Sequence, residues 1–293
     1  MSETKTLNEK IVVNSRYNKI WQSFKSSKTA LISLFIVLAF FAVSIFGSFF
    51  LPYDPNLTEQ NISNPQRPSE THWFGTDEQG RDIFSRVVDG TKVSILVGVM
   101  SVAFSLFFGT ILGAISGYYG GKVDIIIMRI MDIMFAIPSI LLSVCLMMVL
   151  GTGIDKAIVA IGLVAIPQYA RIVRGNVLAE KENDYVKAAK IIGSSDIVII
   201  FKNILPNILS SIIVKSTLGI STAILDVAAL GFLGLGVKPP QSEWGTMLSE
   251  SRKFVTQAPH TMIFPGAAIS ITVLVFNLLG DKLRDALDPK FFN

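Results

Sequence analysis

The chain carries a polar stretch, 184–206 (DYVKAAKIIGSSDIVIIFKNILP), between segments that are hydrophobic enough to cross a membrane. Asn183 or Asp184 is a typical N-cap residue for a helix over the first part of this stretch, and Gly193 is a typical residue directly after a helix end. A second short helix is expected to begin at about residue 195 and to run to Pro206. The stretch therefore predicts a compact helix-turn-helix. It is either an amphipathic connector on the membrane surface or a contact with another protein, and the remainder of the chain decides between the two.

Composition indicates an integral membrane protein. The 293 residues are 51% hydrophobic and 16% charged, and the mean hydropathy is +0.54, which is far from the balance of a soluble domain. A bilayer core about 30 Å thick requires about 20 apolar residues in a helix. Six segments meet or nearly meet this length, which predicts an all-α protein with six transmembrane helices. They are 29–51, 93–117, 133–150 after a more polar helical lead-in, 157–169, which is short and expected to break near Pro167, 208–237 and 262–280.

The basic residues predict the orientation, because cytoplasmic flanks retain Lys and Arg. With both termini in the cytoplasm, the internal segments hold 17 basic residues and the external ones hold seven. The expected organisation is a cytoplasmic tail (1–28), a first transmembrane helix (29–51), an external loop (52–91), a core of five helices (92–280) and a cytoplasmic tail (281–293). The polar stretch then lies in the cytoplasm, within a loop that spans 177–206. A cleaved signal peptide is not expected, since a polar tail precedes the first hydrophobic segment.

The sequence offers little chemistry of its own. The net charge of +4 follows from the topology and requires no nucleic-acid partner. The one cysteine, Cys145, lies in a predicted span as a small apolar residue, and His72 and His260 lack metal-ligand spacing. Gly121-Lys122 resembles the end of a phosphate-binding loop, but the flanking residues of that motif are missing. We therefore expect no catalytic site, no metal site and no cofactor bound by this chain.

Two ionisable residues fall inside the fifth predicted span. Lys215 lies about 12 Å from the start of that span at 1.5 Å per residue, so its side chain is expected to reach the cytoplasmic interface. Asp226 lies about 29 Å along, close to the outer interface. Asp226 is either a helix-end carboxylate that is solvated from outside or a residue of a translocation pathway.

Four sequence blocks together resemble the C-type membrane subunits of dipeptide, oligopeptide and nickel ABC importers. The resemblance covers nearly the whole chain and implies the type I ABC importer permease (MetI-like) fold, in a bacterial or archaeal plasma membrane. The blocks are His72–Asp77 with Gly80-Arg81-Asp82, Ser85-Arg86, Gly90 and Ser94; Tyr169–Arg171 with Val173–Gly175; Leu233–Val237 with Pro239-Pro240 and Glu243–Gly245; and Asn277–Asp281 with Leu283–Pro289.

The stretch 184–206 itself resembles the EAA loop of such permeases, which docks in a cleft of a separate ATPase. By this resemblance the contact with the ATPase is formed by Lys187, Ala188, Ala189, Gly193, Ser194, Leu205 and Pro206. Two residues depart from the family pattern, because Lys187 stands where Glu is usual and Asn203 where an apolar residue is usual. Lys187 is therefore expected to seek an acidic partner or solvent.

The resemblance also implies the partners. They are a homologous B-type permease subunit, two ATPase subunits that bind ATP and Mg, an extracytoplasmic substrate-binding protein, and membrane lipid. Peptides are the expected cargo, and nickel, metal-chelator complexes and glutathione-like compounds are alternatives. A secondary carrier driven by an ion gradient, or a membrane scaffold, would be a different class of protein. A carrier would transport without an ATPase, and a scaffold would move no substrate.

Overall fold

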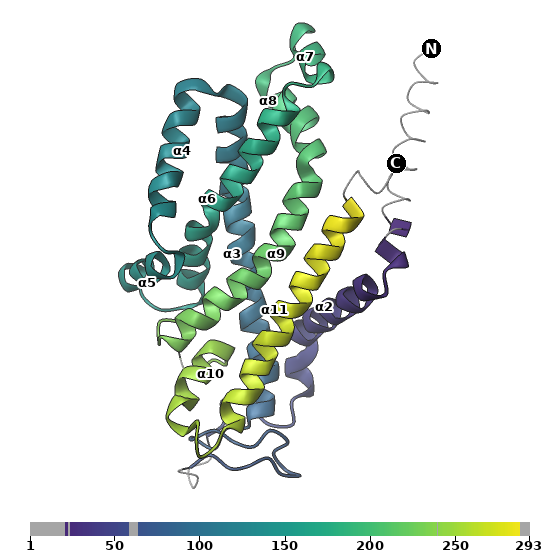
Figure 1. Ribbon diagram of the computed structural model, residues 1–293. Coiled ribbons are helices and arrows are strands. Elements are labelled where there is room, and N and C mark those ends of the chain that lie inside the picture. The colour runs from purple at the N-terminus through teal and green to yellow at the C-terminus, as the bar shows by residue number, and fades with distance from the viewer. Residues whose placement is uncertain (1–20, 23, 59–63, 239, 288–293) are drawn as a thin grey trace.

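The computed structural model describes residues 21–22, 24–58, 64–238 and 240–287, and most of these form helices packed in one bundle (Figure 1). The predicted tail 1–28 lies largely outside the described residues, as do Pro239 and residues 288–293. The elements are α2 (Lys28–Phe46), η1 (Gly47–Phe50), α3 (Ile83–Tyr119), α4 (Gly121–Ala136), α5 (Ser139–Leu150), α6 (Ile154–Glu180), α7 (Asp184–Ile191), α8 (Asp196–Val198), η2 (Ile199–Ile204), α9 (Leu205–Phe232), α10 (Trp244–Ser251), η3 (Arg252–Phe254) and α11 (His260–Leu287).

The prediction of six membrane-crossing segments is confirmed. Five continuous helical segments are long and apolar enough to cross a bilayer, and α4 with α5 forms a sixth that is bent by 92°. The continuous helix predicted over 133–150 is wrong, because the bend falls at Ile137 and Pro138. Ile137 has extended backbone angles, as is usual for a residue before proline, and Pro138 has no N–H to continue the helix.

Proline behaves differently in α6. The expected break near Pro167 is wrong, since α6 continues through it from Ile154 to Glu180. Pro167 is buried, and neighbouring helices can satisfy the backbone groups that a proline leaves free inside a membrane bundle. The neighbour here is α3, which packs along α6 over most of its length. The second span is also longer than predicted, because α3 begins at Ile83 and not at Val93.

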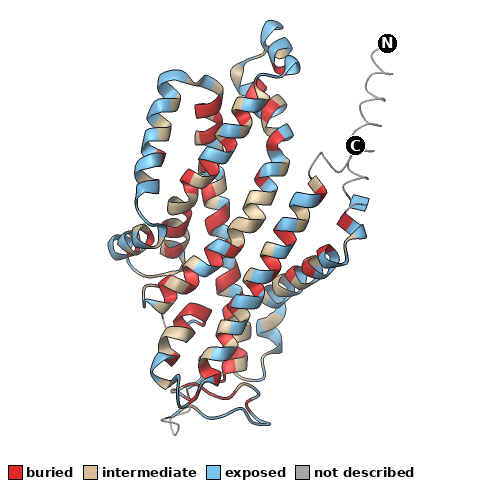
Figure 2. Ribbon diagram, viewed as in Figure 1, coloured by how far each residue is buried: buried red, intermediate tan, exposed pale blue. Residues whose placement is uncertain are grey.

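A row of three glycines lets α3 and α6 approach closely. Gly109, Gly113 and Gly117 lie on one face of α3 at intervals of four residues. A Cβ atom at Gly113 would lie 2.4 Å from the carbonyl oxygen of Ala170, and one at Gly109 would lie 2.5 Å from the Cβ of Tyr169. This is the small-residue packing typical of membrane helices. Figure 2 shows the consequence, with buried residues along α3 and α6 and mostly exposed residues on α4 and α5.

The end of the bundle opposite α7 is closed by α10 and the segment before α3 (Figure 1). The fully buried Trp244 donates a hydrogen bond of 2.9 Å from Nε1 to the carbonyl of Val87. Arg81 and Arg86 each contact the carboxylate of Glu250, at 2.7 and 3.2 Å. Two sequence blocks far apart in the chain, 72–94 and 233–245, thus pack together at this end.

Candidate coupling loop and membrane cavity

Helix α7 ends as its sequence predicts. Asn183 occupies the N-cap position, although its side chain makes no capping hydrogen bond. At the other end, the amide of Gly193 donates to the carbonyl of Lys190 and the amide of Ser194 donates to the carbonyl of Ala189, both at 3.1 Å. This paired arrangement requires a left-handed residue, and Gly193 has φ of +87°. A Cβ at Gly193 would meet nothing within 4 Å, so backbone conformation alone favours glycine here.

The second helix of the pair is continuous with α9. The prediction that it ends at Pro206 is wrong, because the chain passes from α8 through a six-residue π-helix, η2, directly into α9. The π-helix places the amide of Leu205 on the carbonyl of Ile200, five residues earlier. Pro206 follows in the first turn of α9, where its missing N–H falls at the change of hydrogen-bond register. The helix pair is therefore joined rigidly to the fifth membrane span.

The base of this helix pair is anchored to the bundle. Val186 of α7 is buried against a cluster formed by residues of α6, η2 and α9. The hydroxyl of Tyr118, at the end of α3, donates a hydrogen bond of 2.7 Å to Asp196. Lys181 donates from Nζ to the carbonyl of Gly117 at 2.9 Å. Tyr185 contacts Glu180 and accepts a hydrogen bond of 2.9 Å from Asn207, and burial together with the Glu180 contact raises the pKa of Tyr185.

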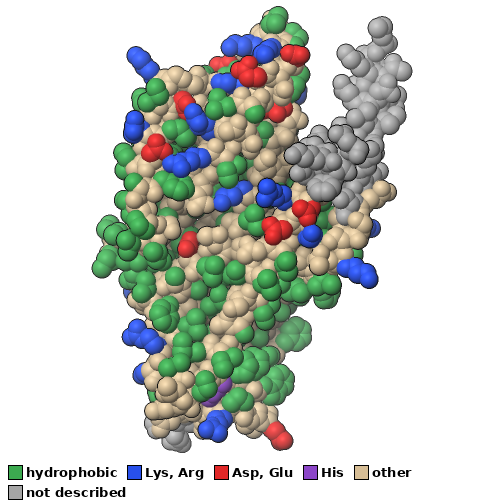
Figure 3. Space-filling view, viewed as in Figure 1, with side chains coloured by type: hydrophobic (Ala, Val, Ile, Leu, Met, Phe, Trp, Pro, Cys, Tyr) green, Lys and Arg blue, Asp and Glu red, His purple; other side chains and the backbone are tan. Residues whose placement is uncertain are grey.

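The tip of the helix pair presents apolar side chains that the sequence reasoning missed. Ile191 and Ile192 are 85% and 82% exposed, and Ile197 of α8 is 68% exposed. Figure 3 shows charged side chains around α7, α8 and the upper part of α4, and the three isoleucines belong to the segment from α7 to α8. The sequence offered one sign of this exposed surface, because two adjacent isoleucines precede the turn glycine in a loop assigned to the cytoplasm. Exposed apolar groups surrounded by charge are typical of an interaction site.

The residues predicted to contact a partner do not all lie at the tip. Ala188 is exposed, whereas Ala189 is half-buried and packs against the cluster around Val186. The side chain of Lys187 lies 3.5 Å from the carboxylate of Glu182, which is the acidic neighbour expected of it. Leu205 and Pro206 lie at the base, in the first turn of α9.

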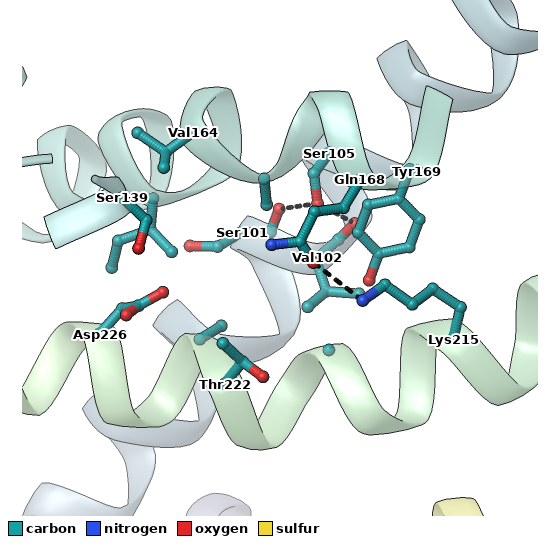
Figure 4. A pocket seen from close by; sticks show the side chains of 14 residues that line it. Ser101, Val102, Ser105, Ser139, Val164, Gln168, Tyr169, Lys215, Thr222 and Asp226 are labelled. Atoms are coloured by element: carbon teal, nitrogen blue, oxygen red, sulfur yellow. Dashed lines mark hydrogen bonds between the residues drawn. The ribbon is translucent and has the colours of Figure 1, made fainter. Parts of the chain in front are cut away.

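A cavity lined by both polar and apolar side chains lies inside the bundle, between α3, α5, α6 and α9 (Figure 4). Asp226 and Lys215, both from α9, line it. The ammonium of Lys215 donates a hydrogen bond of 2.8 Å to the side-chain oxygen of Gln168. Lys215 thus lies against α6 and does not extend to the cytoplasmic interface as expected. Asp226 has no hydrogen-bond or ion-pair partner among the described residues.

A wider groove of about 840 Å³ continues from Lys215 toward the end that carries α7. It runs between α6, α9 and α11. The residues that line it are mostly polar and include Asn176, Glu180, Tyr185, Asn207, Ser210 and Arg284. The small cavity and the wide groove share one lining residue, Lys215.

Comparison with known protein families agrees with this architecture. Residues 109–293 match the family described as binding-protein-dependent transport system inner membrane component. The chain belongs to this family. Residues 15–68 match the N-terminal transmembrane domain of oligopeptide transport permease C. The protein is therefore a multi-pass inner-membrane permease of an ABC transporter.

Individual relatives are similar over most of this permease. It is 48% identical over 277 residues to a dipeptide transport system permease protein, DppC, of Alkalihalophilus pseudofirmus. The aligned region covers 94% of this chain and 90% of the relative. This permease is 44% identical over 279 residues to a glutathione transport system permease protein, GsiD, of Pectobacterium atrosepticum, which covers 95% and 92%. GsiD of Escherichia coli O157:H7 is 45% identical over 280 residues, with the same coverage.

The permease also shares its fold with a solved structure. The inward-facing MetNI methionine ABC transporter superposes with a TM-score of 0.57 over 69% of this chain and 97% of that chain, at 22% identity. The predicted MetI-like fold is therefore confirmed. The remaining third of this permease has no counterpart in the matched MetNI chain.

Proposed function

We propose that this permease forms half of the translocation pathway of an ATP-driven importer for di- or oligopeptides, and that the helix pair α7–α8 transmits the force of a separate ATPase. The observation that carries the proposal is the exposed apolar tip of this pair, on a base anchored to three membrane helices by Val186, Tyr118 and Lys181. A rigid base with an uncovered tip is suited to transmit movement from a docked protein.

The residues that we assign to this contact are those of the sequence prediction, ordered by their position. Ala188 and Lys187 lie on the exposed side of α7, and Gly193 and Ser194 form the turn. Ala189, Leu205 and Pro206 support the pair from below. We add Ile191 and Ile192, because they are the most exposed apolar side chains of the loop.

In this proposal the chain has no catalytic activity and binds no cofactor. ATP and Mg are bound by two ATPase subunits, and the second half of the pathway comes from a homologous B-type permease. An extracytoplasmic binding protein delivers the substrate to the opposite end, where α10 and the segment before α3 form a rigid surface held by Arg81, Arg86 and Glu250. Nucleic acid has no part in the assembly.

A dipeptide or oligopeptide is the cargo we favour, since a dipeptide permease is 48% identical to this chain. A glutathione-like compound is the second candidate, because glutathione permeases are 44–45% identical over equal coverage. Glutathione is itself a peptide, and both candidates present an ammonium group and carboxylates. Nickel or a metal-chelator complex is a further alternative within the same architecture.

Copurification from native membranes tests the assembly. The expected result is a complex that contains a second permease, ATPase subunits and a binding protein, and the ligand that the binding protein retains identifies the cargo. Peptide uptake that depends on ATP and on the binding protein supports the proposal. Uptake that persists without the ATPase and collapses with the ion gradient would instead show a secondary carrier.

A further inference from the structure

Two opposite charges of α9 face the cavity in the membrane bundle, and the coupling loop explains neither of them. Lys215 and Asp226 are eleven positions apart, which corresponds to a rise of about 16 Å along a helix. Figure 4 shows the Lys215 side chain reaching toward Gln168 and the Asp226 side chain in the same space as Ser101 and Ser139. The two charges thus lie at two ends of one cavity.

The polar groups of this cavity are not fully satisfied within the chain. Asp226 is half-buried and has no partner among the described residues. Ser101 is 1% exposed, and its hydroxyl has no hydrogen-bond partner in the described part of the chain. An ammonium has three donors, and the Lys215–Gln168 bond uses one of them. Because an unpaired charge inside a membrane is costly, such residues generally mark a substrate or ion pathway.

The cavity also adjoins a second hollow of the bundle. Lys215 is shared by the cavity and by the wide groove of about 840 Å³ that leads toward α7. A solute that moved from Asp226 past Lys215 would reach this groove, which is lined by several polar side chains. Lys215 therefore lies between the cavity and the groove.

Resting on the proposed function, we propose that this cavity is a transient binding subsite for a zwitterionic peptide, in which Asp226 binds the ammonium and Lys215 binds a carboxylate. A dipeptide spans about 7 Å and a tripeptide about 10 Å when extended, and the lengths of the two side chains make up the remaining distance. Charge-assisted hydrogen bonds of this kind are stronger than neutral ones. The free hydroxyl of Ser101 is available to a peptide group between the two ends.

The subsite is narrow in this conformation. The cavity measures about 50 Å³, which admits water and is well below the roughly 300 Å³ of a small-molecule pocket. Binding of a peptide therefore requires α9 to move away from α6, as in the rocking of helices that accompanies alternating access. The Lys215–Gln168 hydrogen bond joins these two helices, and a peptide carboxylate would replace Gln168 as its acceptor.

The test uses the complete transporter in proteoliposomes with its binding protein loaded with a radiolabelled dipeptide. Asp226→Asn and Lys215→Met remove one charge each, and Lys215→Arg retains it. Asp155→Asn and Lys122→Met are matched controls, because both side chains are exposed and lie outside the cavity. Three quantities are measured: the yield of the assembled complex, the ATPase rate stimulated by the loaded binding protein, and the peptide imported per ATP hydrolysed.

We expect Asp226→Asn and Lys215→Met to leave yield and stimulated ATPase within about twofold of the original and to lower import per ATP at least about tenfold, the loss expected for a charge-assisted bond. Lys215→Arg should restore most of the import. The control variants should match the unmodified transporter. Gln168→Leu removes the partner of Lys215 but not its charge, and should retain import if Lys215 serves the peptide.

Three results would overturn the subsite. Unchanged import per ATP in both charge variants is the first. The second is loss of assembly in Asp226→Asn, which would show that Asp226 pairs with a basic residue of the second permease. The third is a loss in Gln168→Leu equal to that in Lys215→Met, which would show that the hydrogen bond only holds α6 and α9 together. An unmodified transporter that imports no peptide would instead overturn the proposed function, and this inference with it.

Discussion

The hydroxyl of Tyr118 donates a hydrogen bond of 2.7 Å to the carboxylate of Asp196, so the end of α3 is joined to the start of α8. Seventy-eight positions separate the two residues. The bond links the base of the exposed helix pair to the longest helix among the described residues. Movement of the pair is thereby shared between α3 and α9, two of the four helices that line the charged cavity.

Removal of this bond is expected to weaken coupling without unfolding the protein. Tyr118→Phe deletes one hydroxyl and leaves the half-buried carboxylate of Asp196 without this hydrogen bond. The loss should lower the free energy of unfolding by about 1–3 kcal/mol. Peptide import per ATP should fall several-fold, while complex yield stays unchanged. The measurement is import and ATPase rate in parallel, with Tyr119→Phe as control, since the neighbouring Tyr119 is exposed. Equal import by both variants would show that the bond has no part in coupling.

Substitutions at Gly193 and Gly175 form a matched pair that tests the left-handed backbone conformation of the turn. Gly193 has φ of +87°, whereas Gly175 lies inside α6, and a Cβ at either position meets nothing within 4 Å. Gly193→Ala should cost about 1–2 kcal/mol because of the left-handed conformation, and it should lower the ATPase stimulation by the loaded binding protein. Gly175→Ala should be neutral or slightly stabilising. Thermal unfolding of the purified complex measures both, and an equal response would contradict the argument.

Substitutions at Ala188 and Ala189 distinguish an effect on docking of the ATPase from an effect on packing within the permease. Ala188 is exposed, whereas Ala189 packs against the apolar cluster around Val186. Ala188→Trp is expected to leave thermal stability unchanged and to abolish copurification with the ATPase, because a large side chain prevents close approach. Ala189→Trp should lower the thermal midpoint as well, since overpacking costs about 1–3 kcal/mol. Normal ATPase binding by stable Ala188→Trp protein would exclude a close contact at this face of α7.

The sequence was informative where structure depends on local chemistry. Hydropathy predicted the six spans, and Gly193 predicted the end of α7, because both follow from residues adjacent in the chain. Three prolines were harder to interpret, since Pro138 lies between two helices, Pro167 lies within one and Pro206 lies in the first turn of one. What a proline does depends on which neighbours satisfy the freed carbonyls. The contact of Lys215 with Gln168 could not be predicted either, because the two residues are 47 positions apart and lie on different helices.

Some residues of the candidate site could likewise be predicted from the local sequence, and others could not. Gly193 and Ala188 were recognisable from the resemblance of one short stretch, and the structure places both at the exposed end of the helix pair. Ile191 and Ile192 occupy that stretch too, but isoleucine is usually a buried residue, so their residue type alone gives no sign of exposure. Their exposure arises because α7 is two turns long and only Val186 of its residues is buried. A single amphipathic helix with one buried residue leaves its other apolar side chains to a partner.

Glu243 at the opposite end gives a prediction about pH. Its carboxylate is 1% exposed and caps α10, accepting hydrogen bonds from the amides of Gly245 and Thr246 at 2.7 and 2.8 Å and from the Thr246 hydroxyl at 3.0 Å. Glu243→Gln removes the titratable group and keeps one acceptor oxygen for these amides. Burial raises the pKa of Glu243 above its ordinary value of 4.5.

The sign of the pH dependence follows from that direction. Because the folded pKa lies above the unfolded pKa of about 4.5, the contribution of Glu243 to the free energy of unfolding is complete below the unfolded pKa and is lost as the pH rises through the folded pKa. The stability advantage of the original protein over Glu243→Gln should therefore be largest in acid and should shrink toward neutral pH. Thermal midpoints of both proteins across this range measure the difference. A difference that grows with pH would show that the three hydrogen bonds to the carboxylate outweigh its burial.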